Sequence, residues 1–217
     1  MFAKFWSPGD VKTRLAATVG ASVAAEIYRA FVQTLVTRCG ATATRRLLAF
    51  APSDQQAAFV ELARPSWETA PQHGADLGEK MHNYFAEAFA AGVERAVLIG
   101  SDSPNLPPEL LDRAFHELAT VPVVLGPSDD GGYYLIGATG SVPPVFNGVT
   151  WSSPDVWQQT TKLLTDNQIP YAVLPTWYDV DEIQDLRRLQ ADLANATETA
   201  LQHLRDRLEA LLDGVAP

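Results

Sequence analysis

The sequence has one cysteine, few basic residues and no long apolar run, and each shortage excludes a class of protein. A lone Cys39 excludes a disulfide framework within the chain and a cysteine-based zinc cluster. The 16 basic residues against 26 acidic ones give a net charge of −10. This charge argues against a protein that binds nucleic acid through a broad basic face and against a polybasic membrane anchor. No apolar run approaches the roughly 18 residues that span a bilayer. We therefore expect a cytoplasmic protein without nucleic-acid or membrane partners.

The remaining composition is that of a folded α/β protein, with 47% hydrophobic and 19% charged residues. Short apolar runs predict strands at 1–5, 46–50, 96–99, 122–125, 133–138 and 171–174. Longer amphipathic runs predict helices at 13–39 with a break near Gly20, 54–63, 77–91, 107–119, 153–167, and from 181 onward with a break near Asn195. Residues 64–78 are expected to form a long loop. The alternation predicts a mostly parallel, doubly wound sheet with helices on both faces.

A first polar segment follows the first predicted strand, where ligands bind in such sheets. A Pro8-Gly9 turn brings the backbone close to a ligand, and Lys12 and Arg14 stand at the start of a helix. Amide donors and partial positive charge at a helix start favour phosphate. The alternative is that both side chains are solvated surface cations. The chain has only four lysines, which favours the phosphate role.

A second polar segment, Gly100-Ser101-Asp102-Ser103-Pro104, follows the most hydrophobic strand. A carboxylate there could bind a hard divalent cation through oxygen, with phosphate oxygens and another acid as further ligands. Asp181, after the last strand, is the candidate for that second acid. The alternative for each aspartate is that it only caps the following turn or helix.

A third polar segment contains Asp129 and Asp130 followed by Gly131 and Gly132. Aspartates at the end of a strand, followed by glycines with few backbone restrictions, are typical of a carboxylate that must approach a substrate hydroxyl. The same residues could instead form a plain turn between strands. Trp151, before a predicted helix, could stack on a sugar or a base, or pack in the core.

Six motifs in order resemble a known family. They are Ser7-Pro8-Gly9 with Val11-Lys12-Thr13-Arg14-Leu15, Asp76-Leu77-Gly78, Gly100-Ser101-Asp102-Ser103-Pro104, Gly126-Pro127 with Asp130-Gly131-Gly132-Tyr133, Trp151-Ser152, and Asp179-Val180-Asp181. Together they closely resemble the bacterial GT-A-type glycosyltransferases associated with radical-SAM and selenodomain gene clusters. That family belongs to the nucleotide-diphospho-sugar transferase superfamily. The resemblance covers about residues 1–190.

This resemblance implies a GT-A domain, a three-layer α/β/α sandwich that uses a nucleoside-diphosphate sugar and Mg²⁺ or Mn²⁺. By position, Lys12 and Arg14 match the basic residues of the first loop, and Asp102 the acid after the central strand. Asp130 matches the acid before the glycine pair, and Asp181 the second acid of the last motif. Asp129 has no fixed counterpart.

The chain departs from the family pattern at four places. Ser101-Asp102-Ser103 stands in place of the Asp-x-Asp motif of many GT-A enzymes, so metal dependence is inferred and not read from a motif. Lys80 stands where the family has an arginine, and Asp10 where a basic residue is usual. Residues 191–217 are expected to be a helical extension that packs on the domain formed by residues 1–190. We expect a monomer or a weak homodimer.

The resulting hypothesis is glycosyl transfer to a small-molecule hydroxyl. Lys12, Arg14 and a divalent cation on Asp102 would bind the donor diphosphate, and Asp130 would orient or deprotonate the acceptor. One alternative is a nucleotidylyltransferase of the molybdopterin or phospholactate type, which would favour several glycines in the first loop. Another is a nucleotide-binding module without turnover.

Overall fold

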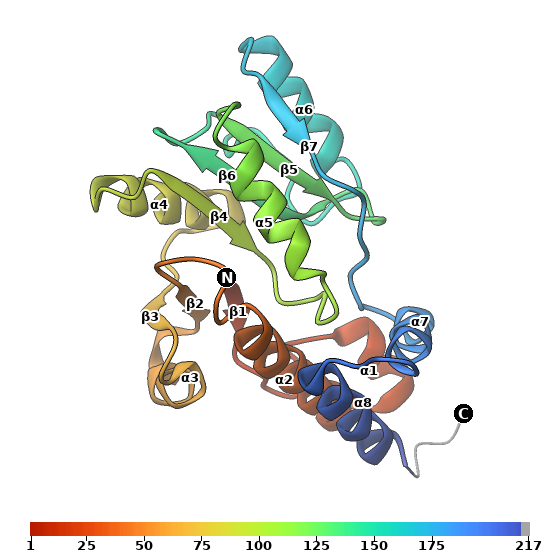
Figure 1. The fold of residues 1–217 in the computed structure, drawn as a ribbon. Coiled ribbons are helices and arrows are strands. Elements are labelled where there is room, and N and C mark those ends of the chain that lie inside the picture. Colours follow the sequence, from red (N-terminus) through yellow and green to blue (C-terminus); the bar gives the residue numbers. More distant parts are fainter. Residues whose placement is uncertain (214–217) are drawn as a thin grey trace. The chain divides into compact units, whose positions relative to one another are not determined.

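The computed structural model describes residues 1–213, in two compact units (Figure 1). Unit 1 is made of residues 1–71, 101–106 and the C-terminal part of the chain from Asp179. Unit 2 is made of residues 72–100 and 107–178. Three separate stretches of sequence therefore meet within unit 1.

Unit 1 contains a three-stranded parallel sheet in the order β1-β2-β3. The strands are β1 (Phe2–Lys4), β2 (Leu47–Ala51) and β3 (Glu68–Pro71). Its helices are α1 (Thr13–Val19), α2 (Ala21–Arg38), α3 (Gln56–Ala63), α7 (Ile183–Leu193) and α8 (Thr199–Leu212), with a short 3-10 turn, Ser53–Gln55, before α3. Phe50 of β2 stacks on Phe59 of α3, with ring centroids 4.9 Å apart, and both are fully buried. This aromatic pair fixes α3 on the sheet.

The expected helical region after β1 is confirmed, together with its break. Ala24, Ile27, Phe31 and Leu35 recur at intervals of three or four residues and are all buried in α2. Gly20 separates α1 from α2 with a φ of 84°, a backbone conformation that side-chain-bearing residues rarely adopt.

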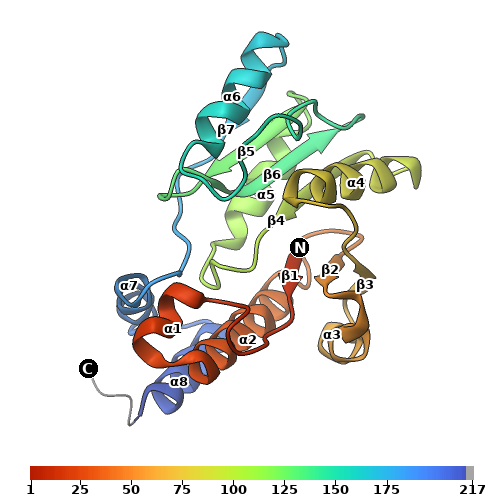
Figure 2. The same cartoon turned by 180° about the vertical axis from the view of Figure 1, so that it is seen from behind.

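Unit 2 contains a four-stranded sheet in the order β4-β6-β5-β7. The strands are β4 (Arg95–Ile99), β5 (Val123–Pro127), β6 (Tyr133–Thr139) and β7 (Tyr171–Val173). Its helices are α4 (Leu77–Ala90), α5 (Pro108–Glu117) and α6 (Val156–Asp166). Helix α5 lies on one face of this sheet (Figure 1), and α4 and α6 lie on the other (Figure 2). Unit 2 is thus layered as α/β/α.

The expectation of one mostly parallel sheet is wrong: one sheet is parallel and the other is mixed. Strand β6 runs antiparallel to both β4 and β5, while β5 and β7 are parallel. The reason is local, because only five residues, Ser128–Gly132, join β5 to β6, and a short connection forces an antiparallel hairpin. The expected loop at 64–78 is also wrong in part, because it contains β3. Strand β3 is a short edge strand ending in proline, so it carries no alternating apolar pattern.

The two C-terminal helices belong to unit 1, and the expected break near Asn195 separates them. Leu204 and Leu208 of α8 are buried, and Arg207 pairs with Glu26 of α2 at 2.8 Å. The predicted boundary at residue 190 lies inside α7, and residues 214–217 of the expected extension lie outside the described part.

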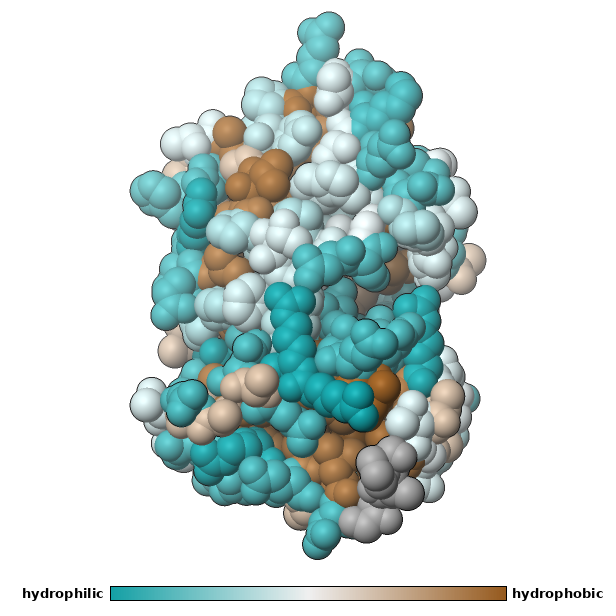
Figure 3. All heavy atoms as spheres, turned by 90° about the vertical axis from the view of Figure 1, so that its right-hand side faces the viewer, coloured by the Kyte–Doolittle hydropathy of each residue, from teal (hydrophilic) through white to brown (hydrophobic). Residues whose placement is uncertain are grey.

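The surface in Figure 3 is mainly hydrophilic or neutral, with hydrophobic residues in separate patches. Among the helices of residues 1–213, none has the length and apolarity to cross a membrane.

Candidate active site

The first loop of unit 1 begins with a tight turn. The amide of Asp10 donates to the carbonyl of Ser7 at 3.1 Å, and Gly9 has a φ of 91°. Proline at the second position and a positive-φ glycine at the third define a type II turn. Pro8 and Gly9, both predicted to approach the substrate, are exposed in this turn.

Lys12 follows in a left-handed conformation, with φ 48° and ψ 44°, at the N-cap of α1. A lysine in this region carries a backbone cost of about 1–2 kcal/mol, which the surrounding contacts must offset. The conformation directs its side chain inward: the side chain is only 1% exposed. The alternative of a solvated surface cation is therefore wrong for Lys12.

The Lys12 ammonium lies between two carboxylates from distant parts of the chain. Its Nζ contacts Asp102 and donates to Oδ1 of Asp181 at 2.8 Å. The rings of Tyr28 and Phe31 lie beside this ammonium, with centroids 5.8 and 5.9 Å from Nζ. We call Lys12, Asp102 and Asp181 the lysine–aspartate cluster.

The electrostatics of this cluster keep Lys12 charged. Burial acts to lower the pKa of Lys12, but the carboxylates of Asp102 and Asp181 outweigh burial and raise that pKa above its ordinary value. The two aspartates remain partly open to solvent, with side chains 43% and 38% exposed. The formal charges of Asp102, Asp181 and Lys12 sum to −1, which favours the approach of a further cation.

Asp102 belongs to a loop, Ser101–Leu106, and all the other residues of this loop are buried. The carbonyl of Asp102 accepts a hydrogen bond from the amide of Val180 at 2.9 Å, and Ser103 Oγ donates to Asp179 Oδ1 at 2.6 Å. These bonds join the loop to the segment that carries Asp181. Hydrogen bonds between two separate segments therefore hold the two acids of the cluster near each other.

The capping alternative for Asp181 is wrong. The N-cap of α7 is Glu182, which forms a capping box with Asp185. Asp181 contributes only its amide to that box, as a donor to Asp185 at 3.1 Å. Its own carboxylate lies on Lys12 instead.

Tyr28 is a member of the site that the sequence did not predict. Its hydroxyl accepts from the amide of Lys4 at 2.9 Å, shares a hydrogen bond with Ser101 Oγ at 2.6 Å, and its ring lies beside the Lys12 ammonium. Burial, with the Asp102 charge, raises the pKa of Tyr28 to about 12. The predicted substrate-binding side chain of Ser101 is thus buried against Tyr28.

Arg14 is the accessible cation of the first loop. Its side chain is 67% exposed, and its nearest carboxylate, that of Glu182, lies 4.0 Å away. A pair that exposed and that long is weak. Arg14 can therefore turn toward an anionic ligand without losing a strong contact.

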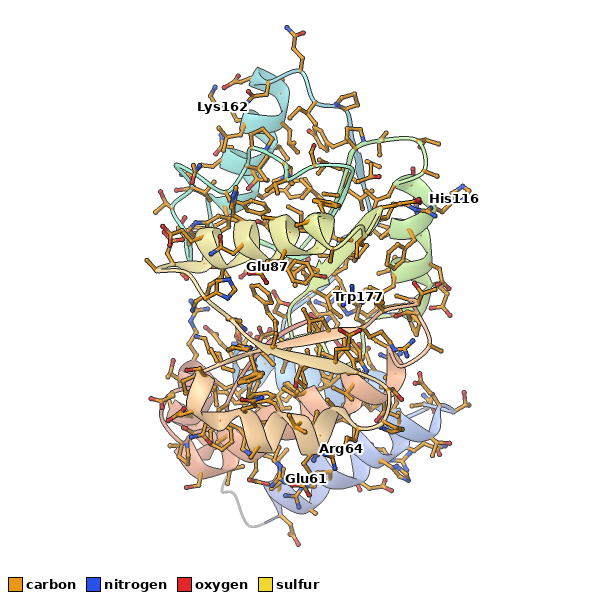
Figure 4. The ribbon with its side chains drawn as sticks, turned by 90° about the vertical axis from the view of Figure 1, so that its left-hand side faces the viewer. Glu61, Arg64, Glu87, His116, Lys162 and Trp177 are labelled. Atoms are coloured by element: carbon orange, nitrogen blue, oxygen red, sulfur yellow. The ribbon has the colours of Figure 1, made fainter. Side chains whose placement is uncertain are left out.

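The predicted Asp129–Gly132 segment lies in unit 2, as the turn of the β5–β6 hairpin. Asp130 Oδ1 accepts from Ser128 Oγ at 2.5 Å and from the amide of Gly132 at 3.0 Å. The amide of Asp129 donates to the carbonyl of Trp177, the residue labelled in Figure 4. The turn alternative describes this geometry, and both aspartates are exposed at its tip.

Gly131 has a packing role in this turn. It has a φ of 90°, and a Cβ there would lie 2.2 Å from the carbonyl oxygen of Pro154, so a side chain would displace the segment before α6.

Trp151 packs within unit 2. A Cβ on Gly78 of α4 would lie 2.4 Å from Trp151 Nε1, so the indole lies directly on the helix backbone. Its ring also meets Tyr133 edge to face at 6.5 Å. The core-packing alternative fits these contacts.

Elsewhere on α4, Glu87, labelled in Figure 4, lies 2.6 Å from His73 Nε2.

A divalent cation at this cluster would need more oxygen ligands than the two carboxylates supply. Within residues 1–213, no group of three or more His, Cys, Asp or Glu side chains is placed to hold a metal ion. Asp102 and Asp181 supply two carboxylates that already share one cation, the Lys12 ammonium. Mg²⁺ commonly binds through one or two carboxylates, completed by substrate phosphates and water. The donor set therefore fits a metal that arrives with a phosphorylated substrate.

Residues 34–153, more than half of the chain, match the family described as uncharacterized protein conserved in bacteria, DUF2064. The chain belongs to the DUF2064 family. This DUF2064 protein is 35% identical to a candidate nucleotide-diphospho-sugar transferase from Desulfovibrio desulfuricans G20, with a TM-score of 0.88. That match covers 99% of this chain and 95% of the other. No curated protein matches the sequence.

Two more distant structures resemble this DUF2064 protein. A cytidylyltransferase from Leptospira borgpetersenii serovar Hardjo-bovis is 10% identical, with coverage of 99% and 94% and a TM-score of 0.53. At that identity the likeness concerns the fold alone. Rv0371C from Mycobacterium tuberculosis H37Rv, solved as a complex with manganese, is 19% identical, with coverage of 73% and 84% and a TM-score of 0.47. The chain thus has an α/β fold resembling nucleotide-diphospho-sugar transferases.

Proposed function

We propose that this protein is a metal-dependent glycosyltransferase that moves a sugar from a nucleoside diphosphate to the hydroxyl of a small-molecule acceptor. The lysine–aspartate cluster is the observation that supports this proposal most strongly. It joins side chains up to 169 residues apart around one buried ammonium. The 35% identity to the candidate sugar transferase of Desulfovibrio supports the choice of a nucleotide-sugar donor.

The donor diphosphate would be bound at the cluster. Asp102 and Asp181 would hold Mg²⁺ or Mn²⁺, and the bound ion would neutralise the charge that develops on the leaving diphosphate. Arg14, with its exposed guanidinium, would contact the phosphate oxygens. We assign Lys12 chiefly to holding the two carboxylates, because its side chain is only 1% exposed. A direct contact between Lys12 and phosphate stays a prediction.

The acceptor hydroxyl would be oriented or deprotonated by Asp130. The bonds that Oδ1 accepts from Ser128 and Gly132 fix this carboxylate in one orientation, and the residue is exposed. A positioned base contributes roughly 10²- to 10⁴-fold to a rate. Asp130→Asn should lower turnover by about that factor while donor binding persists.

The test is turnover of UDP-, GDP-, ADP- and CMP-linked sugars, with and without Mn²⁺, by the wild type and Asp102→Asn. We expect metal-dependent loss of one donor in the wild type and none in Asp102→Asn. Asp112→Asn, a substitution on the exposed side of α5, is the matched control and should retain activity.

Unchanged turnover in Asp102→Asn would remove this residue from the mechanism. Pyrophosphate release from a nucleoside triphosphate in the presence of a phosphorylated acceptor would show that the reaction is nucleotidylyl transfer and not glycosyl transfer. Tight nucleotide binding without any turnover would identify a binding module.

A further inference from the structure

Arg38, at the C-terminal end of α2, connects the C-terminal helix to the loop that carries Asp102. Its Nε donates to both carboxylate oxygens of Glu198, at 2.9 and 3.0 Å, just before α8. Its Nη1 donates to the carbonyls of Pro104 and Leu106, at 3.0 and 2.7 Å. The Arg38 side chain is only 4% exposed, whereas the Glu198 side chain is 41% exposed, so water reaches the Glu198 end of this arrangement.

The loop Ser101–Leu106 has no regular structure, so it depends on such bonds for its shape. Besides Arg38, Asn105 Nδ2 donates to Asp192 of α7 at 3.0 Å. The Arg38 guanidinium bonds two carbonyls of this loop at once. Glu198 holds that guanidinium in place, because its carboxylate accepts from Nε and so fixes the plane of the guanidinium group.

We infer that Arg38, oriented by Glu198, is a positioning residue that holds the Asp102 loop in its binding geometry, so that α8 acts on the site from outside it. The inference rests on the proposed function, because it concerns the divalent cation held by Asp102. Arg38 touches neither Asp102 nor a substrate in this arrangement. It acts through the backbone on the far side of the loop.

A second ion pair between α2 and α8 provides a matched control. Arg207 of α8 pairs with Glu26 of α2 at 2.8 Å, and none of its recorded bonds reaches the loop. Arg207→Gln therefore removes an ion pair between the same helices and leaves the loop contacts in place. Arg38→Lys keeps the positive charge at position 38 but removes the fork that bonds Pro104 and Leu106.

The experiment compares Glu198→Gln, Arg38→Lys and Arg207→Gln in the full chain by two readouts. The first is amide hydrogen exchange at Leu106, which donates to the Ser103 carbonyl at 3.0 Å within the loop, and at Val180, which donates to Asp102. The second is Mn²⁺ binding in the presence of UDP, GDP, ADP or CMP, measured by electron paramagnetic resonance of the free ion.

We expect exchange at both amides to accelerate about tenfold or more in Glu198→Gln and Arg38→Lys, as the loss of charged hydrogen bonds predicts. We also expect Mn²⁺ affinity to fall about tenfold in these two variants, as is usual when a group that orients a metal ligand is lost, and to stay unchanged in Arg207→Gln. Unchanged exchange, or an affinity loss equal to that of Arg207→Gln, would overturn the inference. A wild type that binds no Mn²⁺ would refute the proposed function itself, and the inference with it.

Discussion

Replacing Lys12 by methionine tests the lysine–aspartate cluster directly. Methionine retains the apolar stem beside Tyr28 and Phe31 but removes the ammonium that Asp102 and Asp181 share. The two carboxylates would then repel each other with no cation between them. We expect Lys12→Met to lower the free energy of unfolding.

The magnitude follows from burial. Removing one partner of a fully buried ion pair costs about 3–5 kcal/mol. Here the lysine is buried, but both carboxylates are more than a third exposed, so water screens part of their repulsion. The expected loss is therefore about 1–3 kcal/mol. Lys162→Met is the control, because Lys162 and Asp166 form an exposed pair within one helix, worth about 0.5 kcal/mol or less.

The assay is urea unfolding of Lys12→Met, Asp181→Asn and the double variant. Because the two groups are in contact, the double-mutant cycle should give a coupling free energy of about 0.5–3 kcal/mol. Additive losses, or a Lys12→Met variant as stable as Lys162→Met, would refute the electrostatic account of the cluster.

Two further predictions concern packing around the sites. Burial, followed by the Asp102 charge, raises the pKa of Tyr28 from 10.0 to about 12. The stability that the protonated Tyr28 contributes is therefore complete below about pH 10 and is lost as the pH rises toward 12. Urea unfolding across that window should show a smaller alkaline loss in Tyr28→Phe than in the wild type, and equal losses would contradict the assignment. Gly78→Ala would place a Cβ 2.4 Å from Trp151 Nε1 and 2.5 Å from the Phe146 carbonyl oxygen, so we expect about 1–3 kcal/mol of destabilisation in the same assay. A variant as stable as the wild type would show that the indole does not pack on α4.

Much of the secondary structure was predictable because it depends on local patterns. The spacing of Ile27, Phe31 and Leu35 identifies α2, and the apolar run at 96–99 identifies β4. The direction of β6 was within reach too, because the short 128–132 segment leaves no room for a crossover helix. Strand β3 was not predictable, because its residues, Glu-Thr-Ala-Pro, show no apolar alternation.

The candidate site was predictable only in part. Lys12, Asp102 and Asp181 could be named because polar residues at strand ends stand out against apolar runs. Their mutual contact could not be predicted, because Lys12 has a left-handed backbone conformation that residues other than glycine rarely adopt. Tyr28 and Arg38 lie on α2, and a helical pattern does not tell which of its polar side chains turns toward a distant loop.

The central claim is that Lys12, Asp102 and Asp181 form one site for a diphosphate and its divalent cation. The most direct measurement is the thermal unfolding midpoint of the wild type, Asp102→Asn and Asp181→Asn with a nucleotide sugar, in the presence and absence of Mn²⁺. We expect the wild type to be stabilised only when nucleotide sugar and Mn²⁺ are both present, and both variants to lose this stabilisation. Equal stabilisation of all three proteins would contradict it.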